Sequence, residues 1–114
     1  KGNFVVAGGD FNQVFSTVDD SKYPKIWDGW SSGFIDANDF PKGWQLVTDD
    51  TYPTCRDVSR SYNDEDAKNH NWQYYVIDGF ILSPNVKLLQ INVINEDFVN
   101  SDHNPVYMKF ILEK

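Results

Sequence analysis

The sequence is poor in cysteine and has no long apolar run. Cys55 is the one cysteine, so the chain has no internal disulfide, and such a residue is more commonly a buried apolar group than a reactive thiol. No segment has the apolar core of a signal peptide or the length needed to cross a membrane. The chain begins without Met and reaches an apolar segment at Asn3, so we expect a fragment, from a secreted or cytoplasmic protein.

Basic residues are also scarce. The chain has 10 Lys and Arg against 17 Asp and Glu, which gives a formal charge of -7. This field repels polyanions, so we expect no strong non-specific binding of nucleic acid or of an anionic membrane. A divalent cation held by acidic groups would reverse the local sign, and a small phosphate substrate is therefore compatible with the composition.

The remaining composition is that of a folded protein. Hydrophobic residues make up 40% and charged residues 24% of 114 residues, which suits one modest core and a single domain, 1–114. The four Trp residues are read as caps on that core in preference to contacts with a lipid, a sugar or an inositol headgroup. They are Trp27, Trp30, Trp44 and Trp72.

Apolar patterning predicts an α/β (α+β) chain rich in strands. Asn3 to Ala7 is apolar on both faces, as in a central buried strand. Alternation predicts that Leu89, Ile91 and Val93 share one buried face. Further strands are expected at 44–48, 72–83 and 106–112, short helices near 22–30 and 35–40, and polar loops at 63–71 and 96–104.

Three segments at strand ends carry residues suited to chemistry. In Gly8–Asn12 (GGDFN), Asp10 and Asn12 offer a carboxylate and an amide, although this segment on its own favours a glycine-assisted turn. Asp78 lies in an apolar strand, where a carboxylate needs a partner unless Gly79 marks an edge or a bulge.

The third segment, residues 100–106 (NSDHNPV), holds Asp102 and His103 just before the last strand. Histidine is suited to proton transfer near neutral pH but requires a partner that fixes its tautomer. Asp78 is a candidate for that partner, which leaves Asp102 free for a metal. The alternative is a polar turn with Pro105 fixing the start of the strand.

Taken together, the three motifs resemble those of the endonuclease/exonuclease/phosphatase superfamily of metal-dependent phosphoesterases. The motifs are GGDFN at 8–12, IDGFILS at 77–83 and SDHNPV at 101–106, in the family's order, and TYPTC at 51–55 lies where the family often has a Thr-rich loop. The resemblance implies half of a four-layer α/β/β/α sandwich, with mostly antiparallel sheet and short helices.

The resemblance also implies a role for each matching residue. Asp10 and Asn12 would orient or deprotonate the attacking water and contact the phosphoryl oxygens. Asp78 would orient His103, which would act as the acid/base group or stabilise charge on phosphorus. Asp102 would coordinate a divalent cation, usually Mg²⁺ and in some members Mn²⁺ or Ca²⁺.

The resemblance covers only the second half of the family fold. The first half normally supplies further metal ligands, so we expect the chain alone to be nearly inactive and to expose an apolar sheet face. Nuclease members often have an Arg ahead of the strand Asp, where this chain has Val76 and Ile77, which weakens the case for DNA as substrate. The rival hypotheses are an aromatic-rich module binding carbohydrate or calcium, and a degenerate phosphoesterase scaffold.

Overall fold

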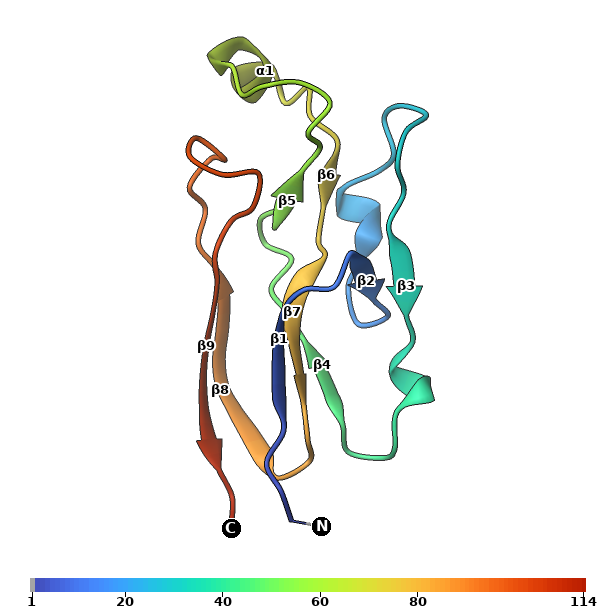
Figure 1. Ribbon diagram of the computed structural model, residues 1–114, viewed down its shortest axis with the longest axis vertical. Helices are drawn as coiled ribbons and strands as arrows, with labels where there is room; N and C mark the ends of the chain where they lie inside the picture. Colours follow the sequence, from blue (N-terminus) through green and yellow to red (C-terminus); the bar gives the residue numbers. More distant parts are fainter. Residues whose placement is uncertain (1) are drawn as a thin grey trace.

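The fold is built mainly from antiparallel strands with a few short helices. The computed structural model describes residues 2–114. The strands are β1 (Val6–Asp10), β2 (Gln13–Phe15), β3 (Gly33–Ile35), β4 (Gln45–Val47), β5 (Cys55–Arg56), β6 (Tyr74–Tyr75), β7 (Asp78–Leu82), β8 (Val86–Val93) and β9 (Val106–Leu112); the helices are the 3₁₀ turns η1 (Asp20–Lys22) and η2 (Ala37–Asp39), and α1 (Asp64–Asn69). The predicted α+β class is confirmed (Figure 1).

A three-stranded antiparallel sheet, ordered β1-β7-β4, forms the centre of the molecule. Gly79 in β7 has no room for a side chain, because a Cβ built there would lie 2.7 Å from the Val47 carbonyl oxygen of β4 and 2.8 Å from the Phe15 ring of β2. The β1–β7 register pairs Gly9 with Gly79 and Asp10 with Asp78. Two carboxylates therefore emerge at the same end of the sheet, on adjacent strands.

The prediction of a central, buried first strand is wrong. β1 pairs only with β7 and lies at the sheet edge, and Val6 is 40% exposed. Of the predicted segment Asn3–Ala7 only Val6 and Ala7 belong to the strand, and among residues 2–114 no second strand pairs with β1 on its outer side. The apolar content of a strand indicates that the strand is able to be buried. It does not indicate whether another part of the chain covers it.

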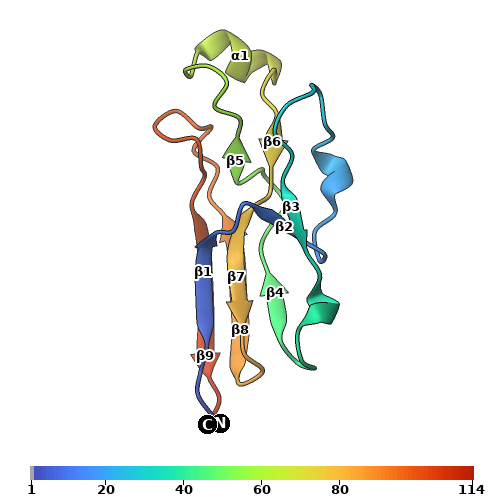
Figure 2. The same ribbon diagram turned by 45° about the vertical axis from the view of Figure 1, so that its right-hand side comes forward.

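The β8–β9 hairpin packs beside the central sheet and follows β7 through the turn at Ser83 (Figures 1 and 2). Ile91 and Val93 are at least partly buried as predicted, but Leu89 is exposed. The cause is a register shift between Leu88 and Gln90, which leaves Leu89 without a cross-strand partner.

Apolar side chains are exposed at the end of β9, although Val86, the partner of Leu112 on β8, is fully buried. Phe110, Ile111 and Leu112 are consecutive, so they point to alternate faces, and all three are exposed. The chain measures 50 × 25 × 18 Å with a radius of gyration of 15.3 Å, against about 13 Å for a compact domain of this length. The expected exposure of apolar sheet residues is confirmed.

The helix predictions are largely wrong. Residues 22–30 hold only the end of η1, because Pro24 and Gly29 interrupt any helical period. Residues 35–40 hold the single turn η2. The expected loop at 63–71 contains α1 instead: the Asn63 side chain accepts a hydrogen bond from the Asp66 N–H, and His70 ends the helix with φ +53°. The loop at 96–104 is confirmed.

The 72–83 segment forms two strands instead of one, since β6 and β7 are separated at Val76 and Ile77. β6 pairs with β5, and the parallel pair β2–β3 was not predicted. Phe15, Leu46 and Ile81 form the small core under the central sheet. Within residues 2–114, no helix is long and apolar enough to cross a membrane.

Candidate active site

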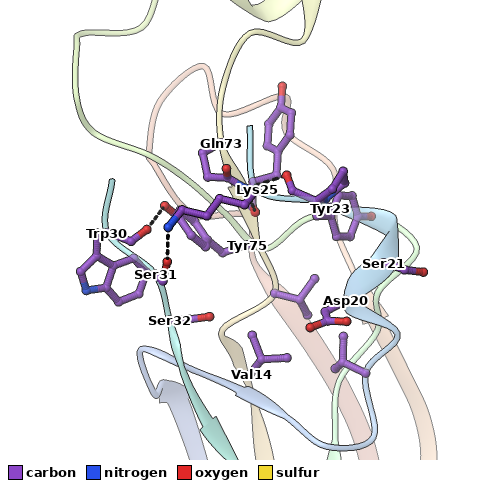
Figure 3. A pocket seen from close by; sticks show the side chains of 14 residues that line it. Val14, Asp20, Ser21, Tyr23, Lys25, Trp30, Ser31, Ser32, Gln73 and Tyr75 are labelled. Atoms are coloured by element: carbon purple, nitrogen blue, oxygen red, sulfur yellow. Dashed lines mark hydrogen bonds between the residues drawn. The ribbon is translucent and has the colours of Figure 1, made fainter. Parts of the chain in front are cut away.

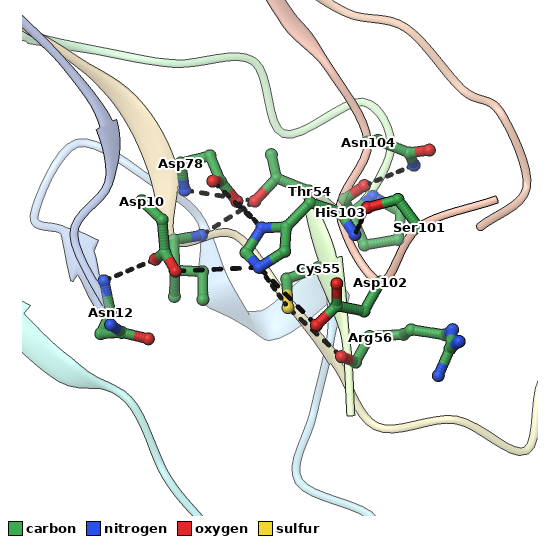
Figure 4. A network of polar contacts seen from close by, with 12 residues as sticks. Asp10, Asn12, Thr54, Cys55, Arg56, Asp78, Ser101, Asp102, His103 and Asn104 are labelled. Atoms are coloured by element: carbon green, nitrogen blue, oxygen red, sulfur yellow. Dashed lines mark hydrogen bonds and ion pairs between the residues drawn. The ribbon is translucent and has the colours of Figure 1, made fainter. Parts of the chain in front are cut away.

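The site assembles where the paired ends of β1 and β7 meet the loop that precedes β9. Asp10 and Asp78 end or begin their strands there, and the loop brings His103 alongside through a bridge between His103 and Cys55 (Figure 4). Four of the five predicted site residues, Asp10, Asp78, Asp102 and His103, are within ion-pairing distance of this imidazole or form it. Three distant segments of sequence thus form one cluster.

Asp78 holds the imidazole from behind. The Nδ1 atom of His103 lies 2.9 Å and 3.1 Å from the two carboxylate oxygens of Asp78. Burial raises the pKa of Asp78, while hydrogen bonds from Thr54 and His103 act in the opposite direction. Because Nδ1–H donates to this carboxylate, the tautomer is fixed and Nε2 faces the open side of the cluster.

Two carboxylates and a thiol surround that open side. His103 Nε2 lies 3.7 Å from Asp10 Oδ2 and 3.9 Å from Asp102 Oδ2. It also lies 3.6 Å from the Cys55 Sγ atom. The surroundings of Nε2 are therefore electronegative, and the His103 side chain is 29% exposed to solvent.

Cys55 is a neighbour of the site that the sequence did not indicate. Burial, followed by the nearby carboxylates, raises the pKa of this thiol to about 12. The thiol therefore stays protonated at neutral pH, which excludes a Cys–His nucleophile of the protease type. Its interpretation as a buried apolar residue is confirmed.

The turn expected for the GGDFN segment is present, and the same carboxylate also faces His103. Asp10 Oδ1 accepts a hydrogen bond of 2.8 Å from the Asn12 N–H, which is the turn, and Asn12 has φ +52°. The other oxygen, Oδ2, is the one near His103. Asn12 itself is exposed and lines the same cavity as His103.

Two positioning residues were missed. Thr54 is fully buried, and its Oγ1 accepts hydrogen bonds from the Ile77 and Asp78 N–H groups at 3.0 Å and 3.2 Å. Asn104 is 2% exposed; its side chain donates to the Pro53 carbonyl and accepts from the Glu96 N–H. Both stood inside motifs quoted from the sequence, but their partners lie far away in the chain and left no local signal.

A cavity of about 450 Å³ opens in front of the imidazole, lined by Asp10, Asn12, Asp102 and His103 on one side. Its aromatic wall contains Trp27 and Trp30, which are 42% and 51% exposed, so their prediction as core caps is wrong. The same prediction holds for Trp72, which is buried, and Trp44, which packs on the core.

A second cavity of about 350 Å³ lies behind this wall (Figure 3). Trp30 and Tyr75, in edge-to-face contact at 5.1 Å, line both cavities, and the Tyr75 hydroxyl donates to the Trp30 carbonyl. Tyr75 belongs to β6, and its ring contact and hydrogen bond fix the position of Trp30.

One group of possible metal ligands lies at this site. Among residues 2–114, ligand atoms of Cys55, Asp102 and His103 lie within 4.8 Å of one another. The protonated Cys55 thiol is a poor ligand for a hard divalent cation, so the Asp102 carboxylate is the member of this group that suits one. Mg²⁺ commonly uses only one or two protein carboxylates and completes its shell with water and substrate phosphate, so a site with this carboxylate fits that ion.

Comparisons with protein-family models, curated proteins and solved structures found no match to this chain. The function is accordingly argued from the geometry of the cluster and the motifs that form it.

Proposed function

We propose that this chain supplies the C-terminal half of a divalent-metal-dependent phosphoesterase of the endonuclease/exonuclease/phosphatase type. It would hydrolyse phosphodiester or phosphomonoester bonds by attack of an activated water. The observation that carries the proposal is the Asp78–His103 pair, whose Nε2 faces both Asp10 and Asp102 at one end of a rigid sheet. Three motifs that resemble one family in their order also meet in space there.

Each residue has a role that its position supports. Asp78 holds the imidazole, so that His103 transfers a proton or stabilises negative charge at Nε2. Asp10 Oδ2 and the Asn12 amide, on one fixed turn, orient the water and the phosphoryl oxygens in the cavity. Asp102, with Asp10 close by, would hold the cation.

A bound Mg²⁺, or Mn²⁺ or Ca²⁺ in its place, would offset the charge that develops on the phosphoryl oxygens. The carboxylates of Asp10 and Asp102 are the oxygen ligands nearest to His103 Nε2.

The proposal includes a second half of the domain that covers the exposed strands. The uncovered end of β9 and the exposed edge strand β1 are what one half of a four-layer α/β/β/α sandwich would leave open. Without the second half, we expect the chain to show little activity, because so few metal ligands come from the described residues.

The test is hydrolysis of bis(p-nitrophenyl) phosphate with Mg²⁺ by the full-length protein and by its His103→Asn variant. Removing the proton-transfer group should lower kcat by about 10²- to 10⁴-fold. The matched control is His70→Asn, since Asn tolerates the left-handed conformation that His70 adopts at the end of α1.

Retention of full activity by the His103→Asn protein would contradict the proposal. The same holds if both variants lose activity equally while remaining folded.

A further inference from the structure

The two arginines of the chain, Arg56 and Arg60, lie together beside the candidate active site. They are the only arginines in the sequence, which carries a net charge of -7. Both guanidinium groups lie over the Trp72 ring, with Cζ 4.5 Å from the ring centroid for Arg56 and 4.6 Å for Arg60. Stacking of this kind holds planar cations in a fixed orientation.

Arg56 is buried without an anionic partner. It is only 8% exposed, its Nη1 donates to the Asp57 carbonyl at 2.9 Å, and its Nε has no hydrogen-bond partner. Among residues 2–114, no carboxylate forms an ion pair with it. A buried, unpaired guanidinium is costly, so its presence indicates that an anion binds there.

Arg60 is more exposed and partly used. Its Nε donates to Asp66 at 2.5 Å and its Nη2 to the Asn71 carbonyl at 3.3 Å. These two contacts do not use Nη1, and they fix the side chain from the side of α1. Arg60 therefore provides a second guanidinium group, which is oriented by its ion pair with Asp66. We expect it to contribute less to anion binding than Arg56.

The two arginines line a polar cavity of about 660 Å³ together with Ser59, Ser61 and Ser101. Arg56 and Asp102 line both this cavity and the one in front of His103, so the two spaces share a wall. In Figure 4 the Arg56 side chain runs past Asp102 and away from the imidazole. The Arg56 guanidinium is thus directed away from His103, so an anion bound there would be separate from a phosphate group beside the imidazole.

We propose that this cavity binds a second phosphate group of the substrate. The inference rests on the proposed function, because the first phosphate is the one cleaved beside His103. The preferred substrates would then be phosphate esters that carry a further phosphate, such as a phosphorylated dinucleotide or a phosphorylated inositol headgroup. Both present the same anion, and guanidinium groups recognise it by paired hydrogen bonds.

The kinetic test compares substrates that differ only by that phosphate, using the full-length protein with Mg²⁺. One pair is dTpdT with its 5′- and 3′-phosphorylated forms, and the other is glycerophosphoinositol with its 4-phosphate. We expect kcat/KM to be about 10- to 100-fold higher for a phosphorylated member. If the dinucleotide pair shows this ratio, the second phosphate is that of a nucleotide. If the glycerophosphoinositol pair shows it, the second phosphate is that of an inositol headgroup.

The ratio should collapse toward one in Arg56→Gln and fall in part in Arg60→Gln. Because Arg60 is exposed but also pairs with Asp66 of α1, circular dichroism should show that both variants keep the wild-type fold. Lys87→Gln, which removes the same charge from the distant β8 strand, should keep the ratio. An unchanged ratio in both arginine variants, or no preference in the wild type, overturns the inference while the proposed function stands.

A binding measurement separates the two proposals. Calorimetric titration of inorganic phosphate with EDTA, in the His103→Asn background, should show binding that weakens at least 10-fold when Arg56→Gln is added. If no phosphate ester is cleaved but this binding is found, the proposed function fails and the anion site remains. Phosphate binding that persists without Arg56, or that is absent with it, overturns the site.

Discussion

The two ends of the central sheet differ in how completely their side chains are partnered. At the end that carries Asp10 and Asp78, buried polar groups are held by partners from distant segments, including the Asn104 side chain and the Thr54 hydroxyl. At the opposite end, apolar residues of β1 and β9 are exposed to solvent. Polar groups at the first end find their partners within the described residues, whereas apolar side chains at the second end remain exposed.

Asn104→Ala, at the end of the sheet that carries Asp10 and Asp78, should have the largest effect on stability. The substitution leaves the Glu96 N–H and the Pro53 carbonyl without their partners at a site that is 2% exposed. We expect the free energy of unfolding to fall by about 3 kcal/mol, measured by urea denaturation. Asn92→Ala, at an exposed position on β8, is the control and should change it by less than about 0.5 kcal/mol. Similar losses for both variants would show that the buried side chain has no special role.

Asp78→Asn should sharpen the comparison by separating activity from stability. Burial raises the pKa of Asp78 above its value in the unfolded chain, so ionisation of this carboxyl destabilises the fold. Below the unfolded pKa the carboxyl is neutral in both states and has no such effect. The destabilisation grows as the pH rises through the folded pKa.

We therefore expect the Asp78→Asn protein to match the wild type in stability at low pH and to exceed it at neutral pH, by less than the Asn104 effect. Activity should fall, because the uncharged amide stabilises a protonated His103 less. Urea titrations from pH 3.5 to 7 measure the stability difference. A variant that is less stable than the wild type at neutral pH would show that the ion pair outweighs the cost of burial.

Ile111→Glu should have the smallest effect, and it tests the apolar end. Ile111 is 46% exposed and stands opposite Lys87 in the hairpin, so the new carboxylate gains a cross-strand partner. The unfolding free energy of this chain should change by no more than about 0.5 kcal/mol. In the full-length protein, where a second half would cover β9, the loss should be about 2 kcal/mol or more. Equal effects in both would contradict a covered face.

The α+β class was predicted correctly, and so was the clustering of the polar residues at strand ends, whereas several individual strands and helices were not. A change from apolar to polar residues is local, so Asp10, Asp78 and His103 were recognisable one motif at a time. Thr54 and Asn104 were not, since the Thr54–Ile77 and Asn104–Pro53 hydrogen bonds join residues 23 and 51 positions apart. Helix 64–69 was missed because its stability comes from capping at Asn63 and an ion pair at Asp66 in place of an apolar face.

Exposure was the least predictable property. The apolar residues of β1 were identified as strand residues, but whether a neighbour covers them depends on the rest of the assembly. The proposed phosphate site beside Arg56 could not be predicted from local sequence either, because Arg56 and Trp72 come into contact only when β5 and β6 pair.

The turn at Asp10 also fixes the orientation of its side chain. Oδ1 accepts the Asn12 N–H at 2.8 Å, and Oδ2 of the same carboxylate lies 3.7 Å from His103 Nε2. Rotation of the carboxylate away from the imidazole would break the hydrogen bond of the turn. The backbone of a five-residue segment thus preorganises this carboxylate before any ligand enters the cavity.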